Sequence, residues 1–463
     1  MNTTIAAVST PYGKGGIAVI RISGDCAVQV AEKMFFPVSG SLLGSVEAGR
    51  AYYGKIVSMG MVIDDGIAVV YRAPRSYTGE DTVEISCHGG ILLTERVLEA
   101  AFSCGAEPAR RGEFTQRAFT NGKLDLTEAE AVIGLIDAES DEKLRLSVSH
   151  ANGVLKRRTE EIYREIVALL SSVYVKTDYP EEDLAELGAE EIAERLGAVS
   201  EKLSDTLKTY RHGKAVSDGV KTAIVGKPNA GKSSLLNRLC GEERAIVTSK
   251  AGTTRDVIEE KVQAGRITLR LWDTAGIREG GDEIEKIGIE KAKRKIKEAE
   301  LIIGVFDISG EPDKEDDGIV RILRSAVDRG VPVIAVLNKD DAGNTVYEKD
   351  VLDALPDGVV TVSVSCLTGN GIDQLKSAAE SQFVNREIDY SGEAVIANAR
   401  QFSALDRAAE CITRARDGLK SGLSADLCGL DLEQALKALG EVDGRTVSEE
   451  VTAEIFRNFC VGK

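Results

Sequence analysis

The chain has 463 residues, of which 43% are hydrophobic and 29% charged, enough for about three domains with real apolar cores. Its 58 basic and 75 acidic side chains give a net charge of −17, which argues against a protein that coats nucleic acid through its overall field. Eight cysteines without a Cys-x-x-Cys pair and only three histidines argue against a zinc site or a secreted disulfide framework, so most cysteines are expected to be small buried side chains. With no signal peptide and no apolar run of ~20 residues, we expect a cytoplasmic protein.

Residues 1–120 are expected to form a mixed α/β domain. Three β-rich runs, at 17–22, 66–71 and 82–86, are each bounded by Gly, Pro or Asp turn signals, and residues 90–102 have helical spacing.

The pattern becomes helical from 121 to 215. Thr127 and Glu130 have the spacing of a capping box. Two later stretches carry apolar residues at steps of three, four or seven, which predicts two amphipathic helices. Their apolar positions are Leu155, Ile162, Ile166, Leu169 and Val173, then Ile192, Leu196, Val199, Leu203, Leu207 and Tyr210. The acidic break at 178–183 contains Pro180, which cannot continue a helix.

Strands and helices alternate from 216 to 380, and the helical period then resumes over 381–463. The simplest interpretation is an α/β domain inserted between two halves of one helical domain.

A nucleotide site is predicted where residues 221–225, a β-rich run, lead into Gly226-x4-Gly231-Lys232-Ser233 and a helix-like stretch. The glycines let the backbone fold around an anion, and the helix N-terminus faces the phosphates. Lys232 would neutralise the β- and γ-phosphates, and the Ser233 hydroxyl would bind Mg²⁺. In this context, a glycine-rich turn that binds nothing is the weaker interpretation.

Three further motifs follow in the order of a GTPase. Residues 273–276 (Asp-Thr-Ala-Gly) come after the β-rich run 267–272 and would hold Mg²⁺ through water. Asn338-Lys339-x-Asp341 comes after the buried run 331–337, and the Asp341 carboxylate can accept from the paired donors of guanine, which adenine lacks. Ser365 begins a base-supporting loop in which Cys366 and Leu367 replace the usual Ala and Lys. We therefore predict a GTPase, against a nucleoside kinase or ATPase.

Residues 252–256 (Gly-Thr-Thr-Arg-Asp) resemble the switch I of bacterial GTPases of the Era and Der type, in which Thr254 would close on Mg²⁺ and the γ-phosphate. Ile277 stands where Ras-like enzymes carry a water-orienting glutamine, so hydrolysis must recruit another group. The carboxylate-rich segment 278–290 is, taken alone, more typical of a solvated, mobile face. The predicted GTP-binding residues are Asn229, Ala230, Gly231, Lys232, Ser233, Ser234, Thr248, Thr253, Thr254, Asp273, Thr274, Ala275, Gly276, Asn338, Lys339, Asp341 and Ser365.

Longer segments resemble the MnmE (TrmE) family of tRNA-modification GTPases over essentially the whole chain. They include STPYGKGGIAVIRISG, SYTGEDTVEISCHGG, RRGEFTQRAFTNGKLDLTEAEAV, GKPNAGKSSLLN, IVTSKAGTTRD, DTAGIRE and the C-terminal CVGK. The GTPase motifs are generic, whereas GEFTQRAFTNGKLDL together with a terminal Cys-x-Gly-Lys is specific to this family.

The resemblance implies an N-terminal α/β folate-binding and dimerisation domain (1–120), a central helical bundle (121–215 and 381–463) and an inserted Ras-like P-loop GTPase domain (216–380). It also implies hydrolysis stimulated by potassium, bound by residues matching Asn229, Thr248, Lys250 and Thr253, with magnesium at Ser233 and Thr254. From the residues alone, Asn229 could equally cap its turn. The family's general base aligns with Glu285, which the sequence alone cannot choose over Glu279 or Glu283.

The family binds a formyl-tetrahydrofolate, and its folate positions match Arg21, Glu84, Lys123 and Lys463. Without the resemblance, a strand-face ion pair is the preferred interpretation of Arg21 and Glu84. The resemblance makes Cys460 a catalytic candidate, although a nucleophilic, redox or structural role stays open.

The family acts with a flavin-containing partner, MnmG (GidA), in a heterotetramer or larger assembly. Together they place a carboxymethylaminomethyl- or aminomethyl-type group on the 5-position of the wobble uridine of certain tRNAs. The basic clusters at 110–111, 156–158 and 291–297 are each more typical of solvated helix surfaces, so we expect the partner to carry much of the tRNA affinity. The alternative function is a ribosome-assembly-type GTPase switch without one-carbon chemistry.

Overall fold

The computed structural model describes residues 3–178, 188–241, 259–272, 294–311, 313–342, 345–384 and 387–463. The chain divides into two compact units. The first combines residues 1–133 with 151–159 and 433–463, and the second contains residues 134–150 and 160–432.

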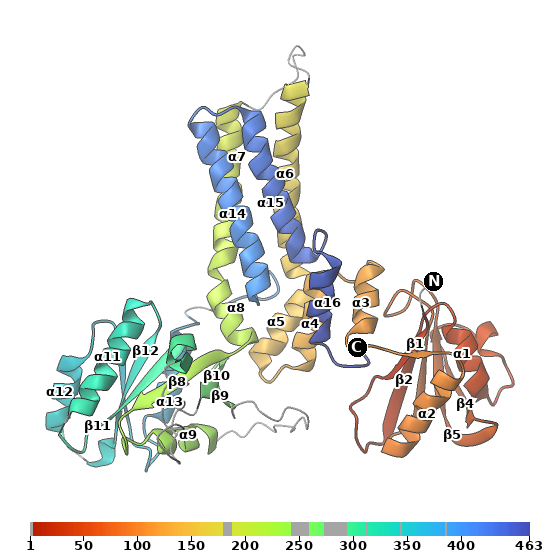
Figure 1. The fold of residues 1–463 in the computed structure, drawn as a ribbon, viewed down its shortest axis with the longest axis horizontal. Helices are drawn as coiled ribbons and strands as arrows, with labels where there is room; N and C mark the ends of the chain where they lie inside the picture. Colours follow the sequence, from red (N-terminus) through yellow and green to blue (C-terminus); the bar gives the residue numbers. More distant parts are fainter. Residues whose placement is uncertain are drawn as a thin grey trace. The chain divides into compact units, whose positions relative to one another are not determined.

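The first unit contains a seven-stranded sheet in the order β3-β4-β5-β6-β2-β1-β7, with helices α1 and α2 on one face (Figure 1). Its elements are β1 (Ile5–Val8), β2 (Ile17–Ser23), α1 (Ala27–Met34), β3 (Phe35–Pro37), β4 (Ala51–Ser58), β5 (Met61–Tyr71), β6 (Thr82–His88), α2 (Ile91–Ser103) and β7 (Glu107–Pro108). The three predicted strands and the predicted helix 90–102 are confirmed, with β5 starting earlier than expected. Alternate residues such as Ile20, Ile22 and Ile85 enter the core beneath the helices, so their neighbours Arg21 and Glu84 lie on the opposite face.

Helices α3 (Glu113–Thr120) and α16 (Glu449–Arg457) and most of α4 (Leu126–Ile136) also belong to this unit, with Phe456 and Phe459 buried against Leu126. The capping box predicted at Thr127 is wrong. The box begins at Asp125, whose Oδ1 accepts from the Glu128 N–H (2.8 Å), while Glu128 Oε2 accepts from the Asp125 N–H (2.8 Å). Thr127 lies inside the helix and donates its hydroxyl to Asp125 Oδ1 (2.7 Å), so the carboxylate takes the capping position.

The second unit contains a helical bundle of α7 (Ala189–Lys208), α14 (Ala399–Lys420), most of α6 (Val154–Asp178) and the first part of α15 (Ala425–Asp443), preceded by α5 (Asp141–Ala151) (Figure 1). The start of α6 (154–159) and the end of α15 (433–443) belong to the first unit. The predicted apolar stripes of the two amphipathic helices are confirmed, since nine of their residues are buried. These are Leu155, Ile162, Ile166, Leu169, Val173, Ile192, Leu196, Val199 and Leu203. Tyr210 differs, because it starts a separate helix, α8 (Tyr210–Ser217).

The second unit also contains a six-stranded sheet in the order β13-β12-β11-β8-β10-β9, parallel except for the β9–β10 pair. Its elements are β8 (Val220–Gly226), α9 (Lys232–Gly241), β9 (Glu259–Ala264), β10 (Ile267–Trp272), β11 (Leu301–Asp307), α11 (Lys314–Asp328), β12 (Val333–Asn338), α12 (Thr345–Ala354), β13 (Val360–Val364) and α13 (Ile372–Ser381). Both faces of the sheet are buried in apolar clusters. The carboxyl ends of the parallel strands meet at one edge, the usual place for a ligand in such sheets.

Cysteine burial only partly follows the prediction. Cys87, Cys411 and Cys428 are buried, three others are half-buried, and Cys26 and Cys460 are exposed. Within the described residues, no helix has the length and apolar character needed to span a membrane.

Candidate functional site

The glycine-rich loop of residues 227–231 lies at the carboxyl edge of the parallel sheet, between the end of β8 and the start of α9. Gly231 has φ of +97° and Asn229 has φ of +61°, both in the left-handed region. A Cβ at Gly231 would lie 2.1 Å from Asn338 Nδ2, and one at Gly226 would lie 2.6 Å from the Val305 carbonyl. Only glycine fits at these two positions, because neighbouring atoms lie where a Cβ would be.

The side chain of Lys232 lies against the backbone of this loop. Its Nζ donates to the carbonyls of Gly226 (2.8 Å) and Lys227 (2.7 Å), which places the amine where an anion would sit above the loop. Ser233 and Ser234 are exposed in the first turn of α9. Because Mg²⁺ takes oxygen ligands, an exposed hydroxyl beside a phosphate loop fits that ion.

The base-binding side of the site begins at the end of β12. Asn338 is buried, and its Nδ2 donates to the Ala230 carbonyl (2.8 Å) while its Oδ1 accepts from the Cys366 N–H (3.3 Å). One side chain thus joins the phosphate loop to the loop after β13.

Asp341 and Ser365, predicted to hold the base, are brought together. The Ser365 hydroxyl donates to Asp341 Oδ1 (2.5 Å) and also accepts from the Thr368 N–H (3.2 Å). Leu367, at the usual lysine position, is 81% exposed.

Lys339 is held by an acidic partner at the end of β11. It has φ of +68° and donates its Nζ to Asp307 Oδ2 (2.5 Å). Burial opposes ionisation of Asp307, but the hydrogen bonds from Lys339 and Ser309 are together stronger and lower its pKa.

Several predicted residues lie outside the described residues. They are Thr248, Lys250, Thr253, Thr254, Asp273, Thr274, Ala275, Gly276 and Glu285, together with Glu279 and Glu283. Of the predicted metal ligands, Ser233 and Asn229 are described, and both are exposed at the loop. The Asn229 turn is closed by the Ala230 N–H donating to the Lys227 carbonyl (3.3 Å), a bond that does not use the Asn229 side chain.

In the first unit, Arg21 and Glu84 face each other across β2 and β6, with Nε 2.8 Å from Oε1. The strand-face ion pair favoured by the residues alone is therefore present. The Arg21 guanidinium lies 5.0 Å from the ring centre of Tyr77 and 5.5 Å from that of Phe114, a cation–π arrangement.

The C-terminal tail docks beside this pair. The Gly462 carbonyl accepts from Ser9 Oγ (3.1 Å) and Arg21 Nη1 (3.4 Å). Gly462 has φ of +94°, and a Cβ there would lie 2.1 Å from the Val8 carbonyl, so glycine is required. The Cys460 carbonyl accepts from the Gly112 N–H (3.3 Å), and the Cys460 side chain is exposed. Val8 also lines a cavity of about 310 Å³ formed with the loop 10–15 and the start of α2.

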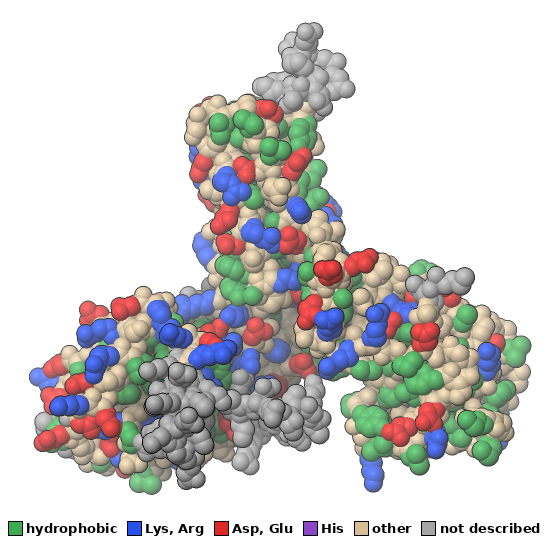
Figure 2. Space-filling model, in the orientation of Figure 1, with side chains coloured by type: hydrophobic (Ala, Val, Ile, Leu, Met, Phe, Trp, Pro, Cys, Tyr) green, Lys and Arg blue, Asp and Glu red, His purple; other side chains and the backbone are tan. Residues whose placement is uncertain are grey.

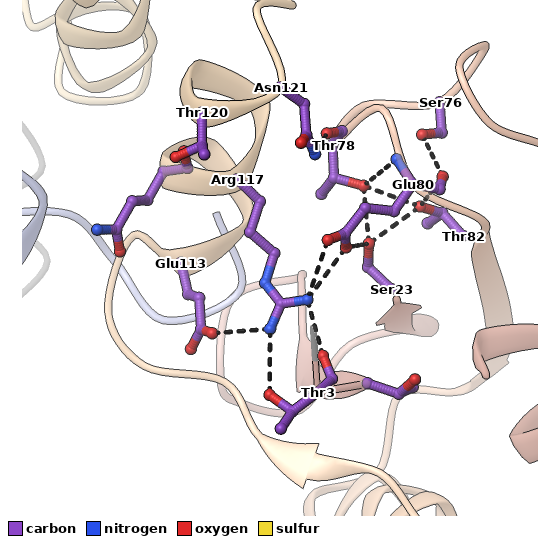
Figure 3. Close-up of polar contacts among 12 residues, drawn as sticks. Thr3, Ser23, Ser76, Thr78, Glu80, Thr82, Glu113, Arg117, Thr120 and Asn121 are labelled. Atoms are coloured by element: carbon purple, nitrogen blue, oxygen red, sulfur yellow. Dashed lines mark hydrogen bonds and ion pairs between the residues drawn. The ribbon is translucent and has the colours of Figure 1, made fainter. Parts of the chain in front are cut away.

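A buried ion network supports the loop that carries Tyr77 (Figure 3). Arg117 of α3 donates from Nη1 to both Glu80 oxygens (3.1 and 3.2 Å) and from Nη2 to Glu113 Oε1 (3.0 Å). Asn121 Nδ2 donates to the Thr78 carbonyl (2.7 Å). Burial opposes ionisation of Glu113, yet hydrogen bonds from Arg110 and Arg117 lower its pKa. Sequence reasoning missed this network, although the GEFTQRAF segment that contains Arg117 was singled out.

Lys123 follows α3, and its Nζ donates to the Pro74 carbonyl of the same loop (3.0 Å). Three of the four predicted folate residues, Arg21, Glu84 and Lys123, are thus joined to one another or to the Tyr77 loop, and Lys463 follows the docked Gly462.

Family models match both units. The model of the GTP-binding protein TrmE N-terminus matches residues 4–123, and the model of the MnmE helical domain matches residues 126–460. The tRNA modification GTPase MnmE of Acetivibrio thermocellus is 40% identical over 464 residues, which covers 99% of this chain and 99% of that protein. The chain belongs to the MnmE family of tRNA modification GTPases. The MnmE of Bacillus subtilis is also 40% identical, over 99% of this chain and 100% of that protein.

As a member of the MnmE family, the chain is a GTP hydrolase that acts in tRNA modification, with GTP as substrate and Mg²⁺ as its metal ion. The predicted fold class is confirmed, with an N-terminal domain, a helical domain and a Ras-like P-loop GTPase fold. Among solved structures, Aquifex aeolicus Era bound to GDP·AlF4− is 28% identical, covers 41% of this chain and 65% of that chain, and has a TM-score of 0.29.

Proposed function

We propose that this MnmE-family GTPase is stimulated by potassium and that, with the flavin-containing partner MnmG (GidA), it modifies the 5-position of the wobble uridine of certain tRNAs. A formyl-tetrahydrofolate supplies the one-carbon unit. The observation that carries the proposal is the C-terminal tail docked against the Arg21–Glu84 pair, through the Gly462 carbonyl. A GTPase switch for ribosome assembly, the alternative function, needs no such site.

The folate would bind at this pair. The Glu84 carboxylate suits the amide and amine edge of a pterin, and Lys123 and Lys463 suit the anionic tail of a folate. We assign Cys460 a catalytic role here, which its exposed side chain permits.

The potassium ion would be bound by Asn229 with Thr248, Lys250 and Thr253, while magnesium would be held by Ser233 and Thr254. Ile277 stands where Ras-like enzymes carry a water-orienting glutamine. Glu285 would therefore act as the general base that orients the attacking water. A cation at Asn229 would stabilise charge that develops during phosphoryl transfer, in place of an arginine finger. The side chain of Asn229 is exposed, and the Ala230–Lys227 backbone bond that closes the turn does not use it, which supports this assignment.

The chain would act as a cytoplasmic homodimer formed through the N-terminal domain. On the face of the first sheet opposite α1 and α2, the large side chains of Ile17, Tyr53 and Ile67 are 68%, 57% and 43% exposed, which suits a protein contact. The partner would supply much of the tRNA affinity, because this chain carries a net charge of −17. Tight tRNA binding by this chain alone at physiological salt would contradict that division.

The GTPase part of the proposal is tested by the rate of GTP hydrolysis in potassium and in sodium at equal ionic strength, repeated with Asn229→Ala. We expect potassium to raise the rate strongly and the variant to lose that increase. Equal rates in the two salts would remove the role of Asn229, while the GTPase assignment would stand.

The one-carbon part is tested by calorimetric titration of the full chain with 5-formyl-tetrahydrofolate. We expect saturable binding that is lost in Glu84→Gln. A chain that hydrolyses GTP but binds no folate would favour the alternative of a switch without one-carbon chemistry.

A further inference from the structure

The residue after Gly226 in the phosphate loop, Lys227, makes contacts that the loop motif does not require. Its Nζ donates to Asp316 Oδ2 (2.6 Å) and Asp313 Oδ2 (3.2 Å). The side chain of Lys227 is 12% exposed and that of Asp316 is 8% exposed, so this ion pair is largely shielded from water. The motif leaves this position unspecified, and the two partners lie 86 and 89 residues away in the sequence.

Both aspartates are also held by hydrogen bonds that do not involve the lysine, because they form the capping box of α11. Asp313 Oδ1 accepts from the N–H groups of Glu315 (2.8 Å) and Asp316 (3.2 Å), and Asp316 Oδ2 accepts from the Asp313 N–H (3.0 Å). The carboxylates therefore lose little further side-chain freedom when Lys227 binds them. Burial opposes the charge on Lys227, but the hydrogen bonds that it donates to Asp316 and Asp313 outweigh this effect and raise the pKa of Lys227, so the ammonium persists at neutral pH.

The backbone of Lys227 is itself part of the nucleotide site. Its carbonyl accepts from Lys232 Nζ (2.7 Å) and from the Ala230 N–H (3.3 Å). At the other end of the loop, the Ala230 carbonyl accepts from Asn338 Nδ2 (2.8 Å). The loop is therefore anchored at both ends, with the left-handed Asn229 between the anchors.

We infer that Lys227, held by Asp316 and Asp313, is a positioning residue that keeps the phosphate loop in its binding conformation before a nucleotide arrives. The pair ties the first half of the loop to α11, and the Lys227 carbonyl in turn orients Lys232 toward the phosphates. A loop that is already ordered loses less conformational entropy on binding, so the effect belongs to affinity more than to the chemical step.

The test uses Lys227→Gln in the full-length chain, with the GDP dissociation constant and the KM and kcat for GTP as readouts. We expect GDP affinity to fall by about tenfold, a coupling of ordinary size for a shielded ion pair, with KM rising more than kcat falls. Lys227→Arg keeps the cation and should recover most of the affinity. Lys314→Gln removes an equal charge from the exposed first residue of α11 and should leave GDP affinity unchanged.

A second variant, Asp316→Asn, removes the charge on the other side of the pair. The amide oxygen of the asparagine can take the place of Asp316 Oδ2 and accept from the Asp313 N–H. This variant should lower GDP affinity to a similar extent, and the double variant Lys227→Gln/Asp316→Asn should be no worse than either single one. The inference is overturned if Lys227→Gln binds GDP within twofold of the parent chain, or if the two losses add. Measurement well below the melting temperature of each variant separates positioning from loss of folding.

Discussion

At the scale of single residues, Arg117 shows how a buried charge organises the N-terminal unit (Figure 3). Its side chain is 12% exposed and lies between Glu80 and Glu113, which are 7% and 8% exposed. The Arg117 guanidinium therefore forms ion pairs with two buried carboxylates. Ser23 Oγ donates a further hydrogen bond to Glu80 (2.9 Å). Removal of one partner of a buried ion pair leaves the other charge buried without compensation. The resulting loss of unfolding free energy is larger than the net stability that the intact pair contributes.

We predict that Arg117→Gln lowers the unfolding free energy of the first unit by about 3–5 kcal/mol, because Glu80 and Glu113 lose their buried counter-charge. The measurement is urea unfolding of the full chain, followed by amide hydrogen exchange in β1 and β2. As a control, Arg96→Gln removes an ion pair with Glu99 in which the side chains are 61% and 59% exposed. That change should stay within about 0.5 kcal/mol. Equal losses in the two variants would contradict a special role for the buried network.

Residue contacts were predictable from the sequence only where a motif implies them. The GTPase motifs place Asn338 in the nucleotide site, and the strand-face interpretation gives the Arg21–Glu84 pair. Arg117 and Glu80 are 37 residues apart, and Lys227 and Asp316 are 89 apart, with no local signal that joins them. Such pairs are set by tertiary packing, which periodicity does not encode.

At the scale of elements, the strands and helices with clean periodicity were predicted and the interrupted ones were not. Strand β4 has a glycine in its middle, Gly54, where a Cβ would lie 2.5 Å from the Phe36 carbonyl. Only glycine fits this close approach, and a glycine in the middle of a strand interrupts the run of β-branched and aromatic residues by which a strand is predicted. Strand β1 has four residues, too short for a pattern to be distinguished. The start of α4 was misplaced because Thr127 and Asp125 both offer a capping oxygen within two residues.

The cap of α4 gives a prediction at this scale. Asp125→Ala removes the acceptor for the Glu128 N–H and should lower the unfolding free energy by about 1–2 kcal/mol. Asp125→Asn keeps a side-chain oxygen at the cap, so most of that stability should remain. Hydrogen exchange of the first-turn amides of α4 is the measurement. The assignment of the cap would be refuted if the two variants were equally destabilised.

At the scale of the whole molecule, the two compact units do not follow the order of the chain. The first unit takes residues from both ends of the sequence, and the docked tail at Gly462 is part of it. The division into 1–120, 121–215, 216–380 and 381–463 stays a prediction, because composition shifts mark where patterns change and not where cores close. The core of the six-stranded sheet illustrates this, since Ala215, Phe383, Val384, Tyr390 and Val395 belong to it.

The fragment 216–380 should therefore be less stable than the fragment 209–397. The longer fragment keeps the buried side chains of Tyr390 and Val395, the bond between His212 Nε2 and the Tyr390 hydroxyl (2.8 Å), and that from the Ile396 N–H to Thr209 Oγ1 (3.1 Å). Each fully buried large side chain contributes about 1.5–3 kcal/mol, so several lost together should lower the midpoint of thermal unfolding clearly. Both fragments are melted with saturating GDP and compared with a 209–397 fragment that carries Tyr390→Ser and Val395→Ser. If the core closes as these contacts indicate, the double variant melts near the short fragment. Equal midpoints for the two unsubstituted fragments would instead place the boundary at 216 and 380.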